Sequence, residues 1–241
     1  MKPMREFIWN PWHGCHKISE GCLNCYMFRH DERYGHHPED IHTTSNYLLP
    51  LKKDKSKQFK IPSGSMIYTC FTSDFFLEEA DEWRKDAYRI MKERSDCHFF
   101  LTTKRIDRFY TSLPQDWNGG YPNVTLAVTV ENQRQADQRL PFYRTLPIHH
   151  KVILCEPLLE TIDLTPYLDS GIDSVSVGGE SGPQARVCQY DWVLALRSQC
   201  LESNIPFTFR QTGAHFIKDG ITYRVPRSQQ LKQAAKARIN T

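Results

Sequence analysis

The sequence predicts an α/β fold in which mostly parallel strands form a full or partial (β/α) barrel of the TIM type. After residue 65, short runs rich in β-branched and aromatic residues alternate with stretches of helical periodicity. These runs are apolar throughout, as in strands that helices cover on both faces. Polar residues gather where each run ends. Because crossovers between parallel strands are right-handed, such units close into a barrel or leave an open, doubly wound sheet, and we favour the barrel.

Seven strands are expected, and helical stretches separate most of them. They cover residues 6–10, 66–71, 97–103, 123–130, 151–157, 174–180 and 206–212. Apolar residues at helical spacing predict a helix over 78–94. A polar helix over 132–139 follows the fourth strand, and Pro141 is expected to end it or to start a new segment. Asp191 is the expected N-cap of a helix that runs to residue 200.

The polar residues at the strand ends are expected to lie on one rim of the barrel, where such folds carry their chemistry. They are Thr72, Ser73, Asp74, Thr102, Thr103, Lys104, Arg105, Thr129, Glu131, Glu156, Glu180, Ser181, Arg210 and Gln211. The repetition of this pattern from strand to strand favours a functional rim. Ordinary loop polarity and helix capping are the alternative explanation.

The composition of the chain narrows the classes of function. A hydrophobic fraction of 39% and an aromatic fraction of 12% are typical of a folded chain and not of a disordered one. The net charge of +3 does not by itself indicate a polyanionic partner. No apolar run is long enough to predict a membrane span, and the first residues lack the pattern of a signal peptide. We therefore expect a cytoplasmic protein with reduced thiols and no membrane partner.

The chain is expected to divide into a barrel domain over residues 1–216 and a basic C-terminal extension over 217–241, with a hairpin or strand followed by a helical tail. Inside the barrel domain, residues 31–65 interrupt the alternation and are predicted to form a lid-like, substrate-binding insertion. The stretches 52–60 and 224–238 are basic. Both are candidate contacts for nucleic acid, although basic tails more often only solvate the chain.

Three cysteines follow the first strand directly. Cys15, Cys22 and Cys25 have the spacing C-x6-C-x2-C, and a glycine stands before each of the first two. Glycine lets backbone N–H groups approach a sulfur atom, and such donors stabilise thiolates. Eight cysteines in a reducing compartment favour metal binding or catalysis over disulfides, and the other five are expected to be buried as small apolar side chains.

Three kinds of metal site fit the cysteine spacing. A closed zinc site needs a fourth ligand, for which His13, His16 and His30 are candidates. A four-cysteine iron–sulfur cluster needs one of the distant cysteines. A 4Fe–4S cluster on the three cysteines alone leaves one iron open to a small molecule. We favour this last site because an open iron needs a polar cavity around it, but the cysteines themselves do not choose between zinc and iron.

The chain resembles the phage-associated three-cysteine family of unknown function and, more broadly, the radical S-adenosylmethionine (SAM) superfamily. The matching phrases are WNPWHGCHKISEGCLNCYM, TSDFF, FLTTKR, VTVENQ, CEPLLE, VGGESGP and PFTFRQTG, which run from residue 9 to residue 213. The resemblance implies a partial barrel with a 4Fe–4S cluster on Cys15, Cys22 and Cys25, and with SAM on the fourth iron. It also implies reductive cleavage of SAM to a 5′-deoxyadenosyl radical that abstracts hydrogen from a substrate, and an electron donor such as flavodoxin or ferredoxin.

The sequence departs from the superfamily pattern in three respects. The usual spacing is C-x3-C-x2-C, whereas the loop between the first two cysteines is three residues longer here. The superfamily also favours an aromatic residue before the last cysteine, whereas this chain has Asn24 there and Tyr26 after it. The Gly-Gly-Glu motif at 178–180 follows a late strand, whereas the superfamily has this motif after the second strand. After its own second strand, the present chain has Thr-Ser-Asp at residues 72–74 instead.

The resemblance suggests roles for the rim residues. Asp74 would accept hydrogen bonds from the ammonium group of SAM, and Lys104 or Arg105 would pair with its carboxylate. Glu131 or Glu156 would bind the ribose hydroxyls. The full set of expected cofactor contacts is Tyr26, Thr72, Ser73, Asp74, Thr103, Lys104 and Glu131, and the catalytic candidates are Glu156, Glu180 and Arg210. A salt bridge at the rim is the alternative role for each charged residue.

The leading interpretation is a radical SAM enzyme whose substrate is open, with nucleic acid or a nucleotide suggested by the basic segments. The first alternative is a non-catalytic nucleic-acid-binding protein that zinc or a cluster stabilises, and its binding would depend strongly on salt. The second is a barrel hydrolase with Glu156 and Glu180 as acid and base, but this alternative gives the cysteine segment no role.

Overall fold

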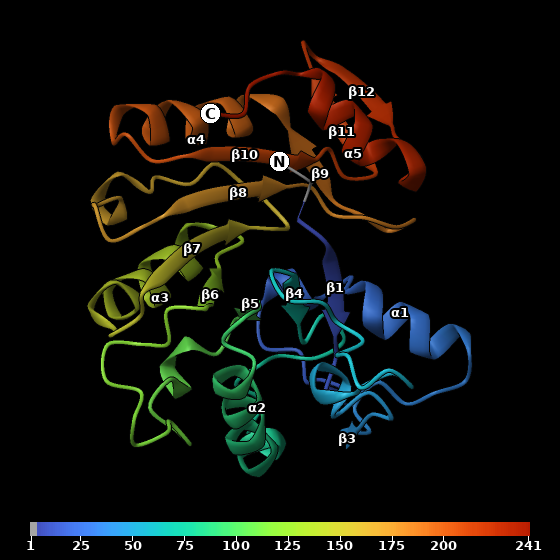
Figure 1. Ribbon diagram of the computed structural model, residues 1–241. Helices are drawn as coiled ribbons and strands as arrows, with labels where there is room; N and C mark the ends of the chain where they lie inside the picture. The colour runs from blue at the N-terminus through green and yellow to red at the C-terminus, as the bar shows by residue number, and fades with distance from the viewer. Residues whose placement is uncertain (1–3) are drawn as a thin grey trace. The chain divides into compact units, whose positions relative to one another are not determined.

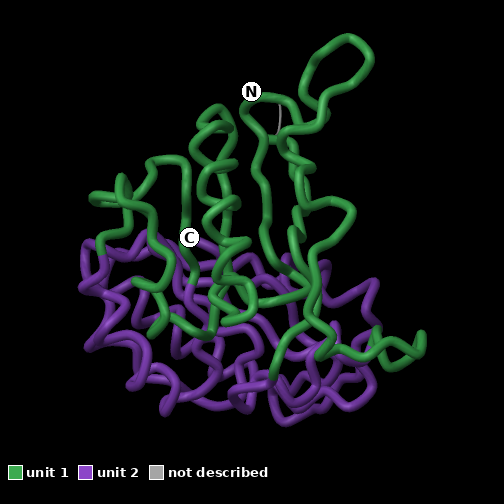
Figure 2. The backbone as a smooth tube through the Cα atoms, turned by 90° about the horizontal axis from the view of Figure 1, so that it is seen from below, with its two compact units in different colours: residues 1–16, 30–127, 147–150 green, residues 17–29, 128–146, 151–241 purple. Residues whose placement is uncertain are grey.

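The computed structural model describes residues 4–241, which form two compact units (Figures 1 and 2). Unit 1 contains the residues up to His16 together with residues 30–127 and 147–150. Unit 2 contains residues 17–29, 128–146 and 151–241. Each unit is therefore assembled from three separate stretches of chain, and the cysteine segment passes from unit 1 into unit 2 after His16.

Short helices and strands alternate along most of the chain. The α-helices are α1 (Tyr26–Arg33), α2 (Asp81–Glu93), α3 (Gln133–Thr145), α4 (Tyr190–Glu202) and α5 (Arg227–Lys236). The strands are β1 (Glu6–Trp9), β2 (Trp12–His13), β3 (His42–Thr43), β4 (Met66–Thr69), β5 (His98–Thr103), β6 (Val124–Thr129), β7 (His150–Cys155), β8 (Ser174–Gly178), β9 (Val187–Gln189), β10 (Phe207–Gln211), β11 (His215–Lys218) and β12 (Ile221–Arg224). Single 3-10 turns lie at Glu20–Cys22, Leu49–Leu51, Glu78–Ala80, Ile106–Arg108 and Thr165–Tyr167.

The main sheet is parallel and open at its edges. Its seven strands have the order β1-β4-β5-β6-β7-β8-β10, which is also their order along the chain. Apolar parallel strands laid down in chain order, with helices between several of them, form the expected α/β architecture, so the fold class is confirmed. A full barrel would require β1 to pair with β10, but these strands are the two ends of the order. Of the two expected forms, a full or a partial barrel, the structure has the partial one.

Aromatic side chains fill the core of unit 1. Trp9 of β1 packs edge-on against Phe99 of β5, with ring centroids 5.8 Å apart, and Tyr88 of α2 packs edge-on against Phe75 at 5.4 Å. All four rings are buried. Arg84 of α2 is also buried, and its Nε donates to the backbone oxygen of Phe75 at 2.8 Å. The charged group thus satisfies a buried carbonyl where the chain leaves β4 for α2.

The predicted insertion at residues 31–65 contacts both ends of the strands of unit 1. Its strand β3 pairs with β2, which follows the carboxyl end of β1. Farther along, Arg94 donates to the backbone oxygen of Ile61 at 2.8 Å. Arg94 stands between the end of α2 and the start of β5, so the later part of the insertion lies at the amino-terminal edge of these strands. A lid role for the segment stays a prediction, and only its earlier part follows the carboxyl end of β1.

Unit 2 contains β8, β10 and most of β7, together with a second sheet of the order β12-β11-β9. β11 pairs in parallel with β9 and antiparallel with β12. α5 packs against β10, and the N–H of Thr212 donates to the backbone oxygen of Gln230 in this helix at 3.3 Å. The β11–β12 hairpin followed by α5 confirms the hairpin and helical tail expected near the C-terminus, and both elements belong to unit 2.

The helix α3 does not end at Pro141 as predicted but continues to Thr145. A proline inside a helix removes one backbone hydrogen bond. Here the residues on both sides of it, Leu140 and Tyr143, are buried. The Tyr143 hydroxyl also donates to the backbone oxygen of Val152 at 3.2 Å. Tertiary packing therefore holds the helix together beyond the proline.

Two further features of unit 2 differ from what the sequence predicts. Asp191 is not the N-cap of α4, because Gln189 has that position and Asp191 lies in the first turn, where its carboxylate is favoured by the positive end of the helix. The sequence does not predict β9, because three residues are too few to show a strand period.

None of the helices in residues 4–241 has the length and apolar character needed to cross a bilayer.

Candidate functional site

The three cysteines of the predicted site differ from the other five in their exposure. Cys15, Cys22 and Cys25 are half-exposed, whereas the other five cysteines are buried, as predicted. Burial raises the pKa of the Cys188 and Cys200 thiols to about 12, so these two stay protonated at neutral pH. The N-terminal segment therefore carries the thiols that are accessible to a ligand. Cys15 belongs to unit 1, and Cys22 and Cys25 belong to unit 2.

In unit 1 the backbone holds Cys15 in a tight turn. The N–H of Cys15 donates to the backbone oxygen of Pro38 at 2.9 Å, and the N–H of Gly14 donates to that of Thr72 at 3.1 Å. Gly14 has a φ of +93°, which favours glycine, and a Cβ there would lie 2.8 Å from the backbone oxygen of Asp40. The glycine thus permits the close approach of two backbone segments that fixes the position of Cys15.

A buried ion pair directs a guanidinium group toward Cys15. Arg105 Nη1 lies 3.7 Å from Cys15 Sγ, and Arg105 Nη2 donates to the backbone oxygen of His16 at 2.7 Å. Asp74 Oδ2 lies 3.3 Å from Arg105 Nη1 and accepts the N–H of Lys104 at 2.8 Å, while Asp74 Oδ1 accepts the Thr103 hydroxyl at 2.7 Å. Asp74 and Arg105 are both buried. A positive charge beside a sulfur favours its thiolate form, which metal ligation requires.

The two hydroxyls that precede Asp74 differ in their hydrogen bonding. Ser73 Oγ donates to the backbone oxygen of Gly14 at 2.6 Å. Thr72 Oγ1 is buried and has no hydrogen-bond partner within residues 4–241. Leaving a buried hydroxyl unsatisfied costs about 1–3 kcal/mol. Thr72 is therefore a predicted cofactor contact whose hydroxyl can still bind a ligand.

All three histidines proposed as zinc ligands lie beside carboxylates of unit 1, with His30 Nδ1 3.6 Å from Asp31 Oδ1. His13 Nε2 lies 2.7 Å from Asp31 Oδ2, and His16 Nε2 lies 2.6 Å from Glu79 Oε1. A hydrogen bond through Nε2 leaves only Nδ1 of each ring for a metal. Hydrogen bonding by His16 also lowers the pKa of Glu79 in spite of its desolvation. These contacts favour a positioning role for both rings over a role as the fourth ligand.

In unit 2, Glu131 anchors the turn that carries Cys22. The Glu131 side chain is fully buried and accepts hydrogen bonds from the Ser19 hydroxyl and, at 3.1 Å, from the N–H of Gly21. Arg139 Nη1 of α3 lies 2.8 Å from its other oxygen and compensates the charge. A Cβ on Gly21 would lie 2.9 Å from the Glu131 carboxylate, so a larger residue here would have to displace that carboxylate. The Ser19 oxygen, whose hydrogen is donated to Glu131, lies 3.8 Å from Cys22 Sγ.

Glu180 holds the same turn from a second side. Its Oε2 accepts the amide of Asn24 at 2.9 Å, and its Oε1 pairs with Arg186 Nη2 at 2.5 Å. Arg186 Nη2 also donates to the backbone oxygen of Glu20 at 2.9 Å. Burial raises the pKa of Glu180, but hydrogen bonds from Arg186 and Asn24 outweigh it and lower the pKa overall. Residues 19–24 are thus fixed by two buried carboxylates, each compensated by an arginine.

A Glu180→Gln variant is expected to lose about 2 kcal/mol of unfolding free energy at pH 7, because a charge-assisted pair becomes a neutral contact. A carboxyl whose pKa is lowered by folding stabilises above its unfolded pKa and loses this contribution as the pH falls through the folded value. The difference between wild type and variant should therefore shrink below the ordinary glutamate pKa of 4.5. Urea unfolding of both proteins at pH 7 and at pH 3.5 measures this difference in unfolding free energy.

The matched control is Glu202→Gln, which changes the same group at an exposed position near the end of α4, where its carboxylate accepts only the Ser198 hydroxyl. This variant should change stability by less than about 0.5 kcal/mol at either pH. An equal loss for Glu180→Gln at both pH values would contradict the assignment of Glu180 as an ionised anchor.

The remaining predicted site residues lie in unit 2 and make fewer contacts. Tyr26 is half-exposed at the start of α1, and its pKa is raised to about 12 because desolvation of the phenol and the neighbouring Cys25 outweigh Arg210 and Arg227. Arg210 is exposed on β10, while Glu156 follows β7 and accepts the Ser176 hydroxyl at 2.6 Å. Tyr26, Cys25 and Arg210 thus interact electrostatically.

Sequence reasoning misses the residues that fix residues 19–24. Ser19, Asn24, Arg139 and Arg186 are the partners of the two buried carboxylates. None of them directly follows a strand of the main sheet, whereas the expected rim consists of polar residues at the strand ends. One sequence signal could have revealed these partners. An acidic residue directly after a strand is followed by a basic residue on the next helix or strand, as in Glu131 and Arg139.

The donor set fits an iron–sulfur cluster chemically. Three accessible thiols share one short segment, and Arg105 supplies a hydrogen-bond donor near the sulfur of Cys15. The buried Thr72 hydroxyl supplies a further donor next to the turn of Cys15. Across residues 4–241, no three His, Cys, Asp or Glu side chains are arranged to hold a metal ion. A site shared by the three cysteines therefore rests on their spacing and their separate surroundings.

Comparison with known proteins places the chain in one family. The model of the family described as "Protein of unknown function (DUF5131)" matches residues 4–239, which is nearly the whole chain. No curated protein and no solved structure matches. The match covers both units and the entire cysteine segment, and on this evidence the chain belongs to the DUF5131 family, whose function is unknown.

Proposed function

We propose that this protein is an iron–sulfur enzyme of the radical SAM type, with a 4Fe–4S cluster held by Cys15, Cys22 and Cys25. The observation that carries the proposal is the contrast between these thiols and the rest. They are half-exposed, on a backbone that buried charged side chains hold in place, whereas the other five are buried. Such rigid support of the ligand backbone is typical of metal sites. The proposed link to phage proteins also rests on the resemblance of the sequence.

When bound, the cluster would supply the electron for reductive cleavage of SAM. Flavodoxin or ferredoxin would deliver this electron to the cluster. The protein contributes charge and orientation. Arg105 stabilises the thiolate of Cys15, and Asp74 holds Arg105 in place. Because Asp74 already accepts four protein donors, we assign it a positioning role.

Thr72 and Lys104 are the proposed contacts of SAM in unit 1. The Thr72 hydroxyl is buried without a partner within residues 4–241, and the half-buried Lys104 uses its backbone N–H, not its ammonium group, to bind Asp74. A hydroxyl and an ammonium group match the amino-acid end of SAM, whose carboxylate accepts hydrogen bonds. In unit 2, Glu131 and Glu180 act as anchors of the cysteine turn instead of ribose or substrate contacts.

The proposal is tested on the full chain purified without oxygen. The expected result is a brown protein with broad absorption near 400 nm, about four irons and about four sulfides per chain, and little zinc. Reduction with dithionite in the presence of SAM should then release 5′-deoxyadenosine and methionine. Colourless protein with one zinc per chain would contradict the cluster and favour the non-catalytic binding protein. An intact cluster with no SAM cleavage would contradict the enzymatic part alone.

A further inference from the structure

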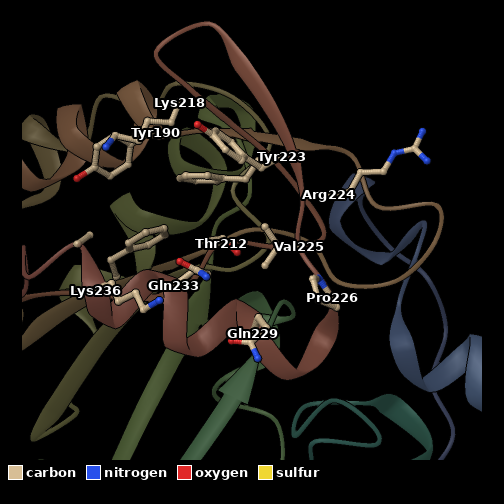
Figure 3. A pocket seen from close by; sticks show the side chains of 13 residues that line it. Tyr190, Thr212, Lys218, Tyr223, Arg224, Val225, Pro226, Gln229, Gln233 and Lys236 are labelled. Atoms are coloured by element: carbon tan, nitrogen blue, oxygen red, sulfur yellow. The ribbon is translucent and has the colours of Figure 1, made fainter.

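Unit 2 contains a cavity of about 570 Å³ between its small sheet and α5 (Figure 3). Its volume lies within the roughly 300–1,000 Å³ typical of small-molecule sites. All of its lining residues lie between Tyr190 and Ala237, so it is built without the cysteine segment. The proposed iron–sulfur chemistry gives this cavity no role.

One side of the cavity is aromatic. Phe209 of β10 and Phe216 of β11 stack with ring centroids 5.9 Å apart, and Tyr190 at the start of α4 lies 5.8 Å from Phe216. The two phenylalanines are buried and form the inner part of the wall. Tyr223 of β12 also lines the cavity but is 44% exposed, so its ring stands nearer to the solvent. The wall offers π-faces of the kind on which a planar ring stacks.

The other lining groups are amides and cations. Gln229, Gln233 and Lys236 project from α5, opposite Tyr223 and Lys218 of the hairpin (Figure 3). Lys218 lies 5.4 Å from the centre of the Tyr190 ring and pairs with the exposed Asp219 only at 3.8 Å. No acidic residue is among the lining residues in the described chain. The cavity therefore favours an anionic ligand that also has a planar, hydrogen-bonding part.

We propose that this cavity binds a nucleotide unit, with its base against the aromatic wall and its phosphate between Lys218 and Lys236. The amides of Gln229 and Gln233 can both donate and accept, as the edge of a base requires. An aliphatic anion would leave the stacking faces unused, and a neutral aromatic ligand would form no ion pair with Lys218 or Lys236. The nucleotide unit comes either from a free nucleotide or from a single strand, since both present the same base and phosphate.

The test is isothermal titration calorimetry of the full-length protein with four probes: dAMP, deoxyadenosine, inorganic phosphate and the oligonucleotide (dA)6. dAMP is expected to bind at least about tenfold more tightly than deoxyadenosine or phosphate alone, because stacking and ionic contacts both contribute. Equal binding of dAMP and (dA)6 identifies the free nucleotide as the source. Tighter binding of (dA)6 that weakens with salt identifies a strand.

Two exposed variants locate the site. Tyr223→Ala and Lys236→Gln should each weaken dAMP binding by about fivefold or more, whereas Lys232→Gln, which removes the same charge from the same helix outside the cavity, should leave it unchanged. Absence of dAMP binding, phosphate binding as tight as dAMP, or equal losses for Lys236→Gln and Lys232→Gln would overturn the proposal. None of these measurements depends on iron, so their outcome is separate from that of the cluster.

Discussion

Alanine at Cys22 is expected to abolish iron binding under anaerobic conditions, with the iron content falling from about four per chain to near zero. The thiolate is the metal ligand, and a methyl group cannot replace it. The same result is expected for Cys15→Ala and Cys25→Ala. Because the three side chains are half-exposed, each truncation should cost only about 1 kcal/mol of stability or less in the metal-free chain. Iron analysis together with urea unfolding separates the two effects.

The control for this series is Cys200→Ala, which also removes one sulfur atom. Cys200 is fully buried in α4, and its thiol stays protonated because burial raises its pKa to about 12. Its replacement should lower stability by about 1–2 kcal/mol through the small cavity that it creates, and should leave the iron content unchanged. If Cys200→Ala lost its iron while Cys22→Ala retained it, the assignment of the ligands would be wrong.

Glu131→Ala is expected to destabilise the protein by about 3–5 kcal/mol, because it leaves the charge of Arg139 buried without its partner. It also removes the acceptor of the Gly21 N–H and the Ser19 hydroxyl. Trypsin should therefore cut faster after Lys17, which is exposed just before this turn. Urea unfolding measures the first effect, and the rate of cleavage at Lys17 measures the second.

A double variant separates global stability from the anchoring of the turn. Replacing both Glu131 and Arg139 by methionine removes the buried pair together and should recover most of the lost stability. The hydrogen bonds to residues 19–21 stay absent, so cleavage after Lys17 should remain fast. A double variant that protects Lys17 as well as the wild type does would show that Glu131 has no specific role in holding the turn.

The strands could be predicted because burial leaves a direct record in the sequence. β6 is an example, since all six of its residues, VTLAVT, are buried and none of them is charged. The glycines before Cys15 and Cys22 are expected to let the backbone turn and to bring N–H groups to the sulfur atoms. The turn is confirmed at Gly14, whose φ is positive, but the N–H groups of Gly14 and Gly21 donate to the Thr72 and Glu131 oxygens instead. A buried strand and a turn at a glycine can be predicted because they depend on a short sequence period or on the residue itself.

The partners of the anchoring residues could not be predicted for the opposite reason. Gly21 and Glu131 are 110 residues apart, and Arg186 contacts the backbone of Glu20 across 166 residues. A single sequence has no periodicity that links such positions. The sequence therefore identified Glu131 and Glu180 as polar residues at strand ends, but not what they bind. The strand β9 cannot be predicted because its three residues are too few to show a strand period.

These long sequence separations determine the order in which the protein can be completed during synthesis. The cysteines leave the ribosome early, but Arg139, Glu180 and Arg186 emerge well over a hundred residues later. Until then the nascent turn lacks its supports, and its thiols face the surrounding medium. The turn would therefore acquire its supports only late in synthesis, and an expression host that delays oxygen exposure until chain release should give a higher yield of the proposed iron-containing form.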